Sequence, residues 1–153
     1  MAVSPGAVAP LDTARGVIAV VGNEPVSAVM LTLTSAEATL VLVGEPSVNQ
    51  LRKLAATEVT ISGRRTSEVD RTASPRGSLV FRVQRFLVRA VDGTPAEDGE
   101  LRSTAAGFVL RRVDGSELKL SALPPALESR VGARIFLAGA LDRAPVAYGV
   151  IAR

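Results

Sequence analysis

Apolar and polar residues alternate in short stretches along the chain, and turn residues such as glycine separate these stretches. Alternation with a period of two is typical of β-strands that bury one face. In the first part of the chain the pattern predicts strands at residues 16–22, 29–34, 38–43, 58–62 and 78–91. We therefore expect an all-β fold.

One segment departs from this pattern. Leu51 and Leu54 have helical spacing within residues 46–56, and Ser47 is placed to cap the N-terminus of a helix. The segment predicts a helix of a few turns at most.

The fifth predicted strand contains a change of phase. Apolar residues occupy odd positions from Leu79 to Val83 and even positions from Phe86 to Ala90, so the alternation shifts near residues 84–85. One extra residue that keeps apolar side chains on the buried face before and after it is a β-bulge. We expect a bulge here, with a break between two strands as the alternative.

Residues 51–63 have an altered copy at residues 127–139, and each copy ends an alternating stretch at a glycine. Around this copy, the second part of the chain repeats the order of the first with shorter loops. Its predicted strands are residues 99–101, 107–111, 117–120, 134–138 and 145–151, and a proline-containing segment at 123–127 replaces the helix. The pattern predicts one small β-unit used twice.

The order strand, strand, strand, short helix, strand, strand resembles the OB-fold, a five-stranded Greek-key barrel. The resemblance covers residues 15–153 and implies two tandem OB-like β-barrels, each with at most one short helix. The expected parts are an extended tail (1–14), a first barrel (15–93) with a projecting loop (64–77), a linker (94–100) and a second, shorter barrel (101–153). A single fused sandwich and SH3-like barrels are the alternatives.

Composition excludes several kinds of catalysis. The chain has no histidine, cysteine or tryptophan, so it lacks the residues of Ser-His-Asp and Cys-His catalysis, of thiolate or imidazole metal sites, and of disulfides. The clustered carboxylates lie beside turn-forming residues, where we expect solvated side chains without acid-base function; they are Glu68, Asp70, Glu97, Asp98 and Glu100. We expect no enzymatic activity, no metal and no cofactor.

No targeting or membrane-spanning segment is predicted. Residues 1–14 have neither a basic start nor a long apolar run, and no later stretch of about eighteen residues is uninterruptedly apolar. We expect a cytoplasmic protein, or one bound peripherally to the cytoplasmic face of a membrane complex.

Basic residues gather in the middle of the chain. Residues 52–89 contain nine basic and three acidic side chains, a net charge of +6, against +3 for all 153 residues. Sixteen of the eighteen basic residues are arginine, which is enriched at protein interfaces and binds carboxylates with two parallel hydrogen bonds. Base composition of the coding sequence is an alternative cause of this excess. The expected partner-binding residues are Arg64, Arg65, Arg71, Arg76, Arg82 and Arg89.

These features predict a non-enzymatic accessory subunit that binds other proteins and stabilises a larger assembly, for instance as an extrinsic subunit of a membrane-bound energy-converting complex. The alternative is a binder of single-stranded nucleic acid or another polyanion that uses the same basic residues. Stacking on bases needs exposed aromatic side chains. The four phenylalanines lie in apolar strands, which leaves Tyr148, and we therefore expect a protein partner.

Overall fold

The computed structural model describes residues 11–22, 27–36, 38–70 and 77–153. Among these residues ten strands form one continuous sheet, which confirms the all-β prediction. The strands are β1 (Asp12–Val21), β2 (Ala28–Leu33), β3 (Thr39–Val43), β4 (Thr57–Asp70), β5 (Ser78–Val91), β6 (Thr94–Thr104), β7 (Gly107–Arg111), β8 (Glu117–Lys119), β9 (Arg134–Ala138) and β10 (Ala147–Ala152). The helices are α1 (Ser47–Arg52) and the short 3-10 helix η1 (Pro125–Arg130).

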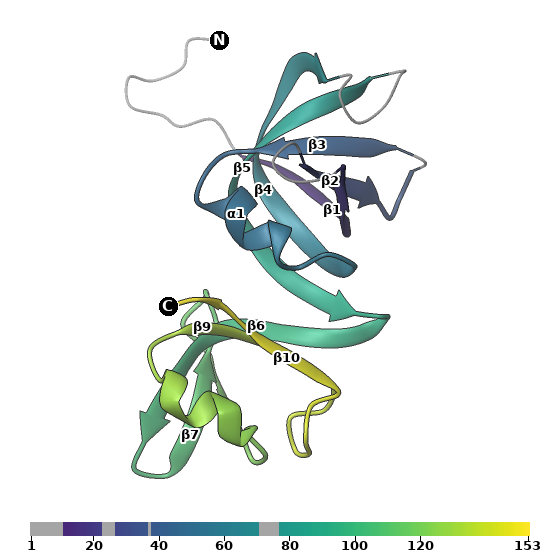
Figure 1. Ribbon diagram of the computed structural model, residues 1–153. Coiled ribbons are helices and arrows are strands. Elements are labelled where there is room, and N and C mark those ends of the chain that lie inside the picture. Colours follow the sequence, from purple (N-terminus) through teal and green to yellow (C-terminus); the bar gives the residue numbers. More distant parts are fainter. Residues whose placement is uncertain (1–10, 23–26, 37, 71–76) are drawn as a thin grey trace, which may run out of the picture.

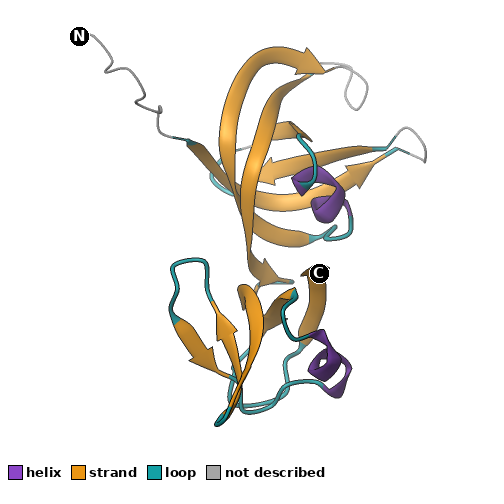
Figure 2. Cartoon of the chain, turned by 90° about the vertical axis from the view of Figure 1, so that its left-hand side faces the viewer, coloured by secondary structure: helices purple, strands orange, loops and turns teal. Residues whose placement is uncertain are grey.

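The chain forms two halves that lie one above the other (Figures 1 and 2). In the N-terminal half, described residues 11–93, the strand pairings run in a closed cycle: β1 pairs with β2, β2 with β3, β3 with β5, β5 with β4, and β4 with β1. β1 begins at Asp12, so the end of the expected tail is strand, and residues 1–10 lie outside the described residues. Each strand of this half therefore has two partners within the half.

The C-terminal half, residues 94–153, repeats most of this pairing pattern. β6 pairs with β7 and β9, β7 pairs with β8, and β9 pairs with β10. Among the described residues no pairing joins β8 to β10. The order β8, β7, β6, β9, β10 is therefore open and ends in two strand edges.

An apolar core fills each half, and the halves also share apolar contacts. Phe81 is fully buried in the core of the N-terminal half, as Leu101 is in the core of the C-terminal half. Phe136 of β9 and Ile151 of β10 pack against the core of the N-terminal half. Burial of these two side chains therefore stabilises the contact between the halves.

β5 has the predicted bounds and contains the predicted bulge. Two consecutive residues of β4 pair with Val83 and Arg85, so Gln84 is the extra residue. A second bulge follows at Arg89, and the sequence pattern does not show it. Leu79, which the alternation placed on the buried face, is 51% exposed.

The expected projecting loop at 64–77 is strand over residues 64–70, because β4 continues through Gly63 to Asp70 alongside β5. Residues 71–76 lie outside the described residues. The sequence pattern predicted that the strand ends at Gly63, because glycine often interrupts strands. Here the missing side chain of Gly63 lets the carbonyl group of Arg82 approach closely, so the ladder continues.

Residues 94–100, expected to be a linker, form the first part of β6. Asp92 and Gly93 have φ angles of 48° and 80° and make the predicted tight turn, which starts β6 back along β5. β6 then leaves β5 and pairs with β9. Asp98 and Gly99, where a turn was expected, are instead a buried part of this strand. The Asp98 carboxylate has hydrogen-bond partners that the turn-like composition of this segment does not show.

Gly63 is a position where we expect a one-carbon substitution to be costly. A Cβ atom there would lie 1.9 Å from the Arg82 carbonyl oxygen, which belongs to the backbone of the neighbouring strand. Gly63→Ala is expected to lower the free energy of unfolding by about 1–3 kcal/mol, measured from the urea midpoint. Ser62→Ala, the control, should change it by less than about 0.5 kcal/mol. Equal effects of the two substitutions would contradict this explanation.

Candidate functional site

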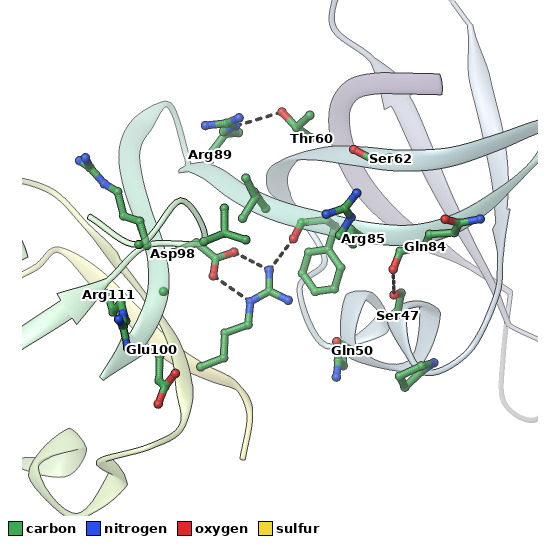
Figure 3. Close-up of a pocket in the computed structure, with 18 of the residues that line it drawn as sticks. Ser47, Gln50, Thr60, Ser62, Gln84, Arg85, Arg89, Asp98, Glu100 and Arg111 are labelled. Atoms are coloured by element: carbon green, nitrogen blue, oxygen red, sulfur yellow. Dashed lines mark hydrogen bonds and ion pairs between the residues drawn. The ribbon is translucent and has the colours of Figure 1, made fainter. Parts of the chain in front are cut away.

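A groove of about 1050 Å³ separates the two halves and is lined by both. One wall consists of the outer face of β1, β4 and β5 and the start of α1, and the other consists of β6, the β7–β8 turn and β9. Figure 3 shows side chains of the two walls around one space. The chain fold therefore brings residues far apart in sequence to a single polar surface.

A polar row crosses three strands of the N-terminal wall. Thr13 pairs with Ser62 across β1 and β4, and Ser62 pairs with Arg85 across β4 and β5. Residues opposite each other in antiparallel strands share a face of the sheet, so all three line the groove. The bulge leaves both Gln84 and Arg85 exposed, which adds an amide to this row.

The start of α1 completes this wall with Ser47 and Gln50. Ser47 is the first helical residue and Pro46 occupies the N-cap position, so the capping role expected for Ser47 is wrong. The Ser47 hydroxyl instead donates to the backbone carbonyl of Gln84 at 3.5 Å. This contact links the helix to the bulge.

A buried ion pair connects the two walls at the base of the groove. The Asp98 carboxylate accepts hydrogen bonds from Nε and Nη2 of Arg134 at 2.8 and 2.7 Å, and from the backbone N–H of Val88 at 2.8 Å. Arg134 Nη2 also donates to the Phe86 carbonyl, and its guanidinium carbon lies 4.3 Å from the centre of the Phe86 ring. Since Val88 and Phe86 belong to β5, this pair holds the C-terminal half to the N-terminal half.

The groove has an excess of positive charge. Six arginines line it against two carboxylates, Asp98 and Glu100. Two of the arginines have carboxylate partners, because Arg134 binds Asp98 and Arg112 binds Glu97 through hydrogen bonds of 2.8 and 3.0 Å. The hydrogen bond to Glu97 raises the pKa of Arg112. These arginines are neutralised within the protein.

The remaining groove arginines are available to a ligand. Arg89 donates from Nε to the Thr60 hydroxyl at 3.0 Å, which leaves its terminal nitrogens. Within the part of the chain that the structure describes, the side chains of Arg85 and Arg111 have no hydrogen-bond or ion-pair partner. Arg85 belongs to the N-terminal wall and Arg111 to the C-terminal wall (Figure 3). An anion between the walls would meet guanidinium groups from both sides.

The β7–β8 turn presents a further polar feature beside the groove. The Asp114 carboxylate accepts hydrogen bonds from the Ser116 hydroxyl at 2.6 Å and the Ser116 backbone N–H at 2.8 Å. These two bonds, the hydroxyl first, lower the pKa of Asp114. This confirms the turn expected at residues 114–115 and holds the neighbouring wall in place.

The structure describes four of the partner-binding residues expected from the sequence, and they lie in two places. Arg64 and Arg82 pair across β4 and β5, whereas Arg65 lies over the Phe81 ring at 5.8 Å. Arg89 alone of the described ones lines the groove. Arg71 and Arg76 lie outside the described residues.

Sequence reasoning did not single out Arg85, Arg111 and Arg134 as site residues. A signal for Arg85 was present, because two successive polar residues at 84–85 interrupt an otherwise alternating strand. Arg134 could not be assigned, since its partner Asp98 lies in a segment that resembles a solvated turn. Arg111 reaches the groove only through the pairing of β6 with β7.

Aromatic side chains contribute little to the groove surface. Phe81, Phe86 and Phe136 are buried and Phe108 is half-buried, as expected, while Tyr148 is 45% exposed. Phe86 touches the groove beneath Arg134. Stacking platforms for bases are therefore missing from the described walls.

Metal-binding clusters and membrane-spanning helices are both absent from the described residues. These residues hold no group of three or more carboxylate, histidine or cysteine side chains that could bind a metal ion. No helix among them is long and apolar enough to cross a membrane.

Comparison of the sequence with known proteins finds no matching family model and no match among curated proteins.

Proposed function

We propose that this chain is a non-enzymatic accessory subunit that binds an acidic segment of another protein in the groove between its halves. The observation that carries the proposal is the pair Arg85 and Arg111, which belong to opposite walls and have no partner among the described residues. Guanidinium groups bind carboxylates through paired hydrogen bonds. Hydroxyl and amide groups of the polar row offer further contacts.

We also propose that the two halves are OB-like units of common design. Support comes from the element order and from the pairings, since β1, β2, β3, β4 and β5 correspond to β6, β7, β8, β9 and β10. The pairing that closes the first cycle, β3 with β5, has no counterpart in the second half among the described residues. In this proposal the N-terminal unit is closed and the C-terminal unit is open.

Single-stranded nucleic acid is the second candidate ligand, because the same arginines attract phosphate groups. The positive charge of the groove is the only feature that supports nucleic acid as the ligand. Base stacking typically contributes about 1–3 kcal/mol per base, and the buried phenylalanines cannot supply it. A carboxylate-rich segment needs charge and hydrogen bonds only, which favours the protein ligand.

A binding titration with two anions of matched length tests this choice. A twelve-residue glutamate peptide is expected to bind at about 50 mM salt, to weaken towards about 200 mM salt, and to bind more tightly than a twelve-nucleotide thymidine strand. Fluorescence anisotropy measures both. Tighter binding of the nucleic acid would support the second candidate, and no binding of either anion at low salt would refute the groove as an anion site.

A further inference from the structure

The sheet of the C-terminal half has two edge strands, β8 and β10. These strands differ in how well they are protected against pairing with a further strand. β8 has only three residues, and two of them, Glu117 and Lys119, are exposed and charged. β10 is longer and contains no charged residue from Ala147 to Ala152. Natural sheets use short strands and charged side chains to prevent pairing at an edge. β8 has both of these safeguards and β10 has neither.

β10 also has exposed side chains on one face of the sheet, although the same face of the neighbouring strand β9 is buried. Tyr148 pairs with Leu137 and Val150 pairs with Ile135 across β9 and β10, so each pair shares a face. Leu137 and Ile135 are 3% and 0% exposed, whereas Tyr148 and Val150 are 45% and 37% exposed. The core of the C-terminal half is therefore incompletely covered next to β10.

The N-terminal half shows what covers the corresponding position. There the last strand, β5, pairs in parallel with β3 from Leu40 with Leu79 to Val43 with Arg82. β10 has only β9 as a partner among the described residues. An added strand along β10 would supply the missing neighbour and shield Tyr148 and Val150.

The position of β10 relative to the groove indicates which strand would be added. β10 ends at Ala152, and the next residue, Arg153, lines the groove. The groove therefore reaches the C-terminal end of β10, so a segment that extends out of the groove there can run along this strand. Strand addition supplies affinity through backbone hydrogen bonds and selects alternate side chains.

We propose that β10 is a strand-addition site for the partner whose acidic part occupies the groove, and this inference rests on the proposed function. The partner segment has carboxylates at one end and an apolar-polar alternation at the other. Its apolar side chains cover Tyr148 and Val150, and its backbone bonds to the free edge. If the acidic part comes first in the partner, the added strand is antiparallel to β10; if it comes last, the strand is parallel.

Synthetic peptides test this proposal. One has four glutamates followed by three Val-Thr repeats, and a second has the two parts in reverse order. A control of each carries an N-methyl group on every valine and threonine, which removes the N–H donors on both sides of the strand. At least one Val-Thr peptide is expected to bind tenfold or more tightly than its N-methylated control. Hydrogen exchange at the β10 amides should slow on binding. Equal affinity of the peptides and their controls would overturn strand addition.

A variant separates failure of this inference from failure of the groove. Val150→Lys places a charge on an exposed position of the edge and should remove the advantage of the Val-Thr peptide, while the twelve-residue glutamate peptide binds as before. If all the peptides bind the wild type with equal affinity and lose binding in the Arg85→Glu variant, strand addition alone is refuted. The groove then remains the binding site. A dimer in gel filtration that Val150→Lys dissociates would also refute it, because a second copy would then occupy the edge.

Discussion

Replacing Asp98 with alanine is expected to destabilise the protein by about 3–5 kcal/mol, the usual cost of removing one partner of a buried ion pair. The Asp98 side chain is 3% exposed and accepts three hydrogen bonds, two from Arg134 and one from the Val88 backbone. Its loss leaves a guanidinium that is 29% exposed and a buried N–H without their acceptor. Thermal and urea unfolding measure the change.

The matched control is Glu97→Ala. Glu97 is the neighbour of Asp98 on β6 and also binds an arginine through two hydrogen bonds, but it and Arg112 are 36% and 37% exposed. An exposed pair of this kind contributes less than about 1 kcal/mol. Similar losses of stability for the two variants would contradict the assignment of Asp98 as the residue that holds the halves together.

Local pattern was sufficient for the bounds of some strands and for the bulge in β5. β7 and β9 have the predicted bounds, and the bulge at Gln84 follows from a change of phase that the pattern contains. β5 buries alternate residues on either side of the bulge, whereas β9 is a short apolar run that is buried on both faces. This information is local, so the sequence alone carries it.

Other features depend on residues that are distant in sequence. β4 continues past Gly63 because β5 lies beside it, and residues 94–100 are strand because β9 pairs with them. Asp98 resembles a turn aspartate until Arg134, on another strand, supplies its hydrogen bonds. The candidate groove has the same origin, since Arg85 and Arg111 come together only when the halves stack.

The double charge reversal Arg85→Glu/Arg111→Glu is expected to weaken binding of the twelve-residue glutamate peptide about 100-fold, which corresponds to about 2.8 kcal/mol. Both arginines line the groove and neither has an internal partner among the described residues. The substitutions remove two cations and add two anions where the peptide carboxylates lie. Because both side chains are exposed, the variant should unfold near the wild-type urea midpoint.

The control for this variant is Arg130→Glu/Arg143→Glu, which changes the net charge by the same amount. Both control residues are exposed and lie outside the groove, so only the long-range, salt-screened part of the attraction is affected. The most direct test of a binding site in the groove is the affinity of the glutamate peptide for the wild type and these two variants, measured at one salt concentration. A loss of about 100-fold confined to Arg85→Glu/Arg111→Glu is the predicted result, and equal losses in both variants would contradict a binding site in the groove.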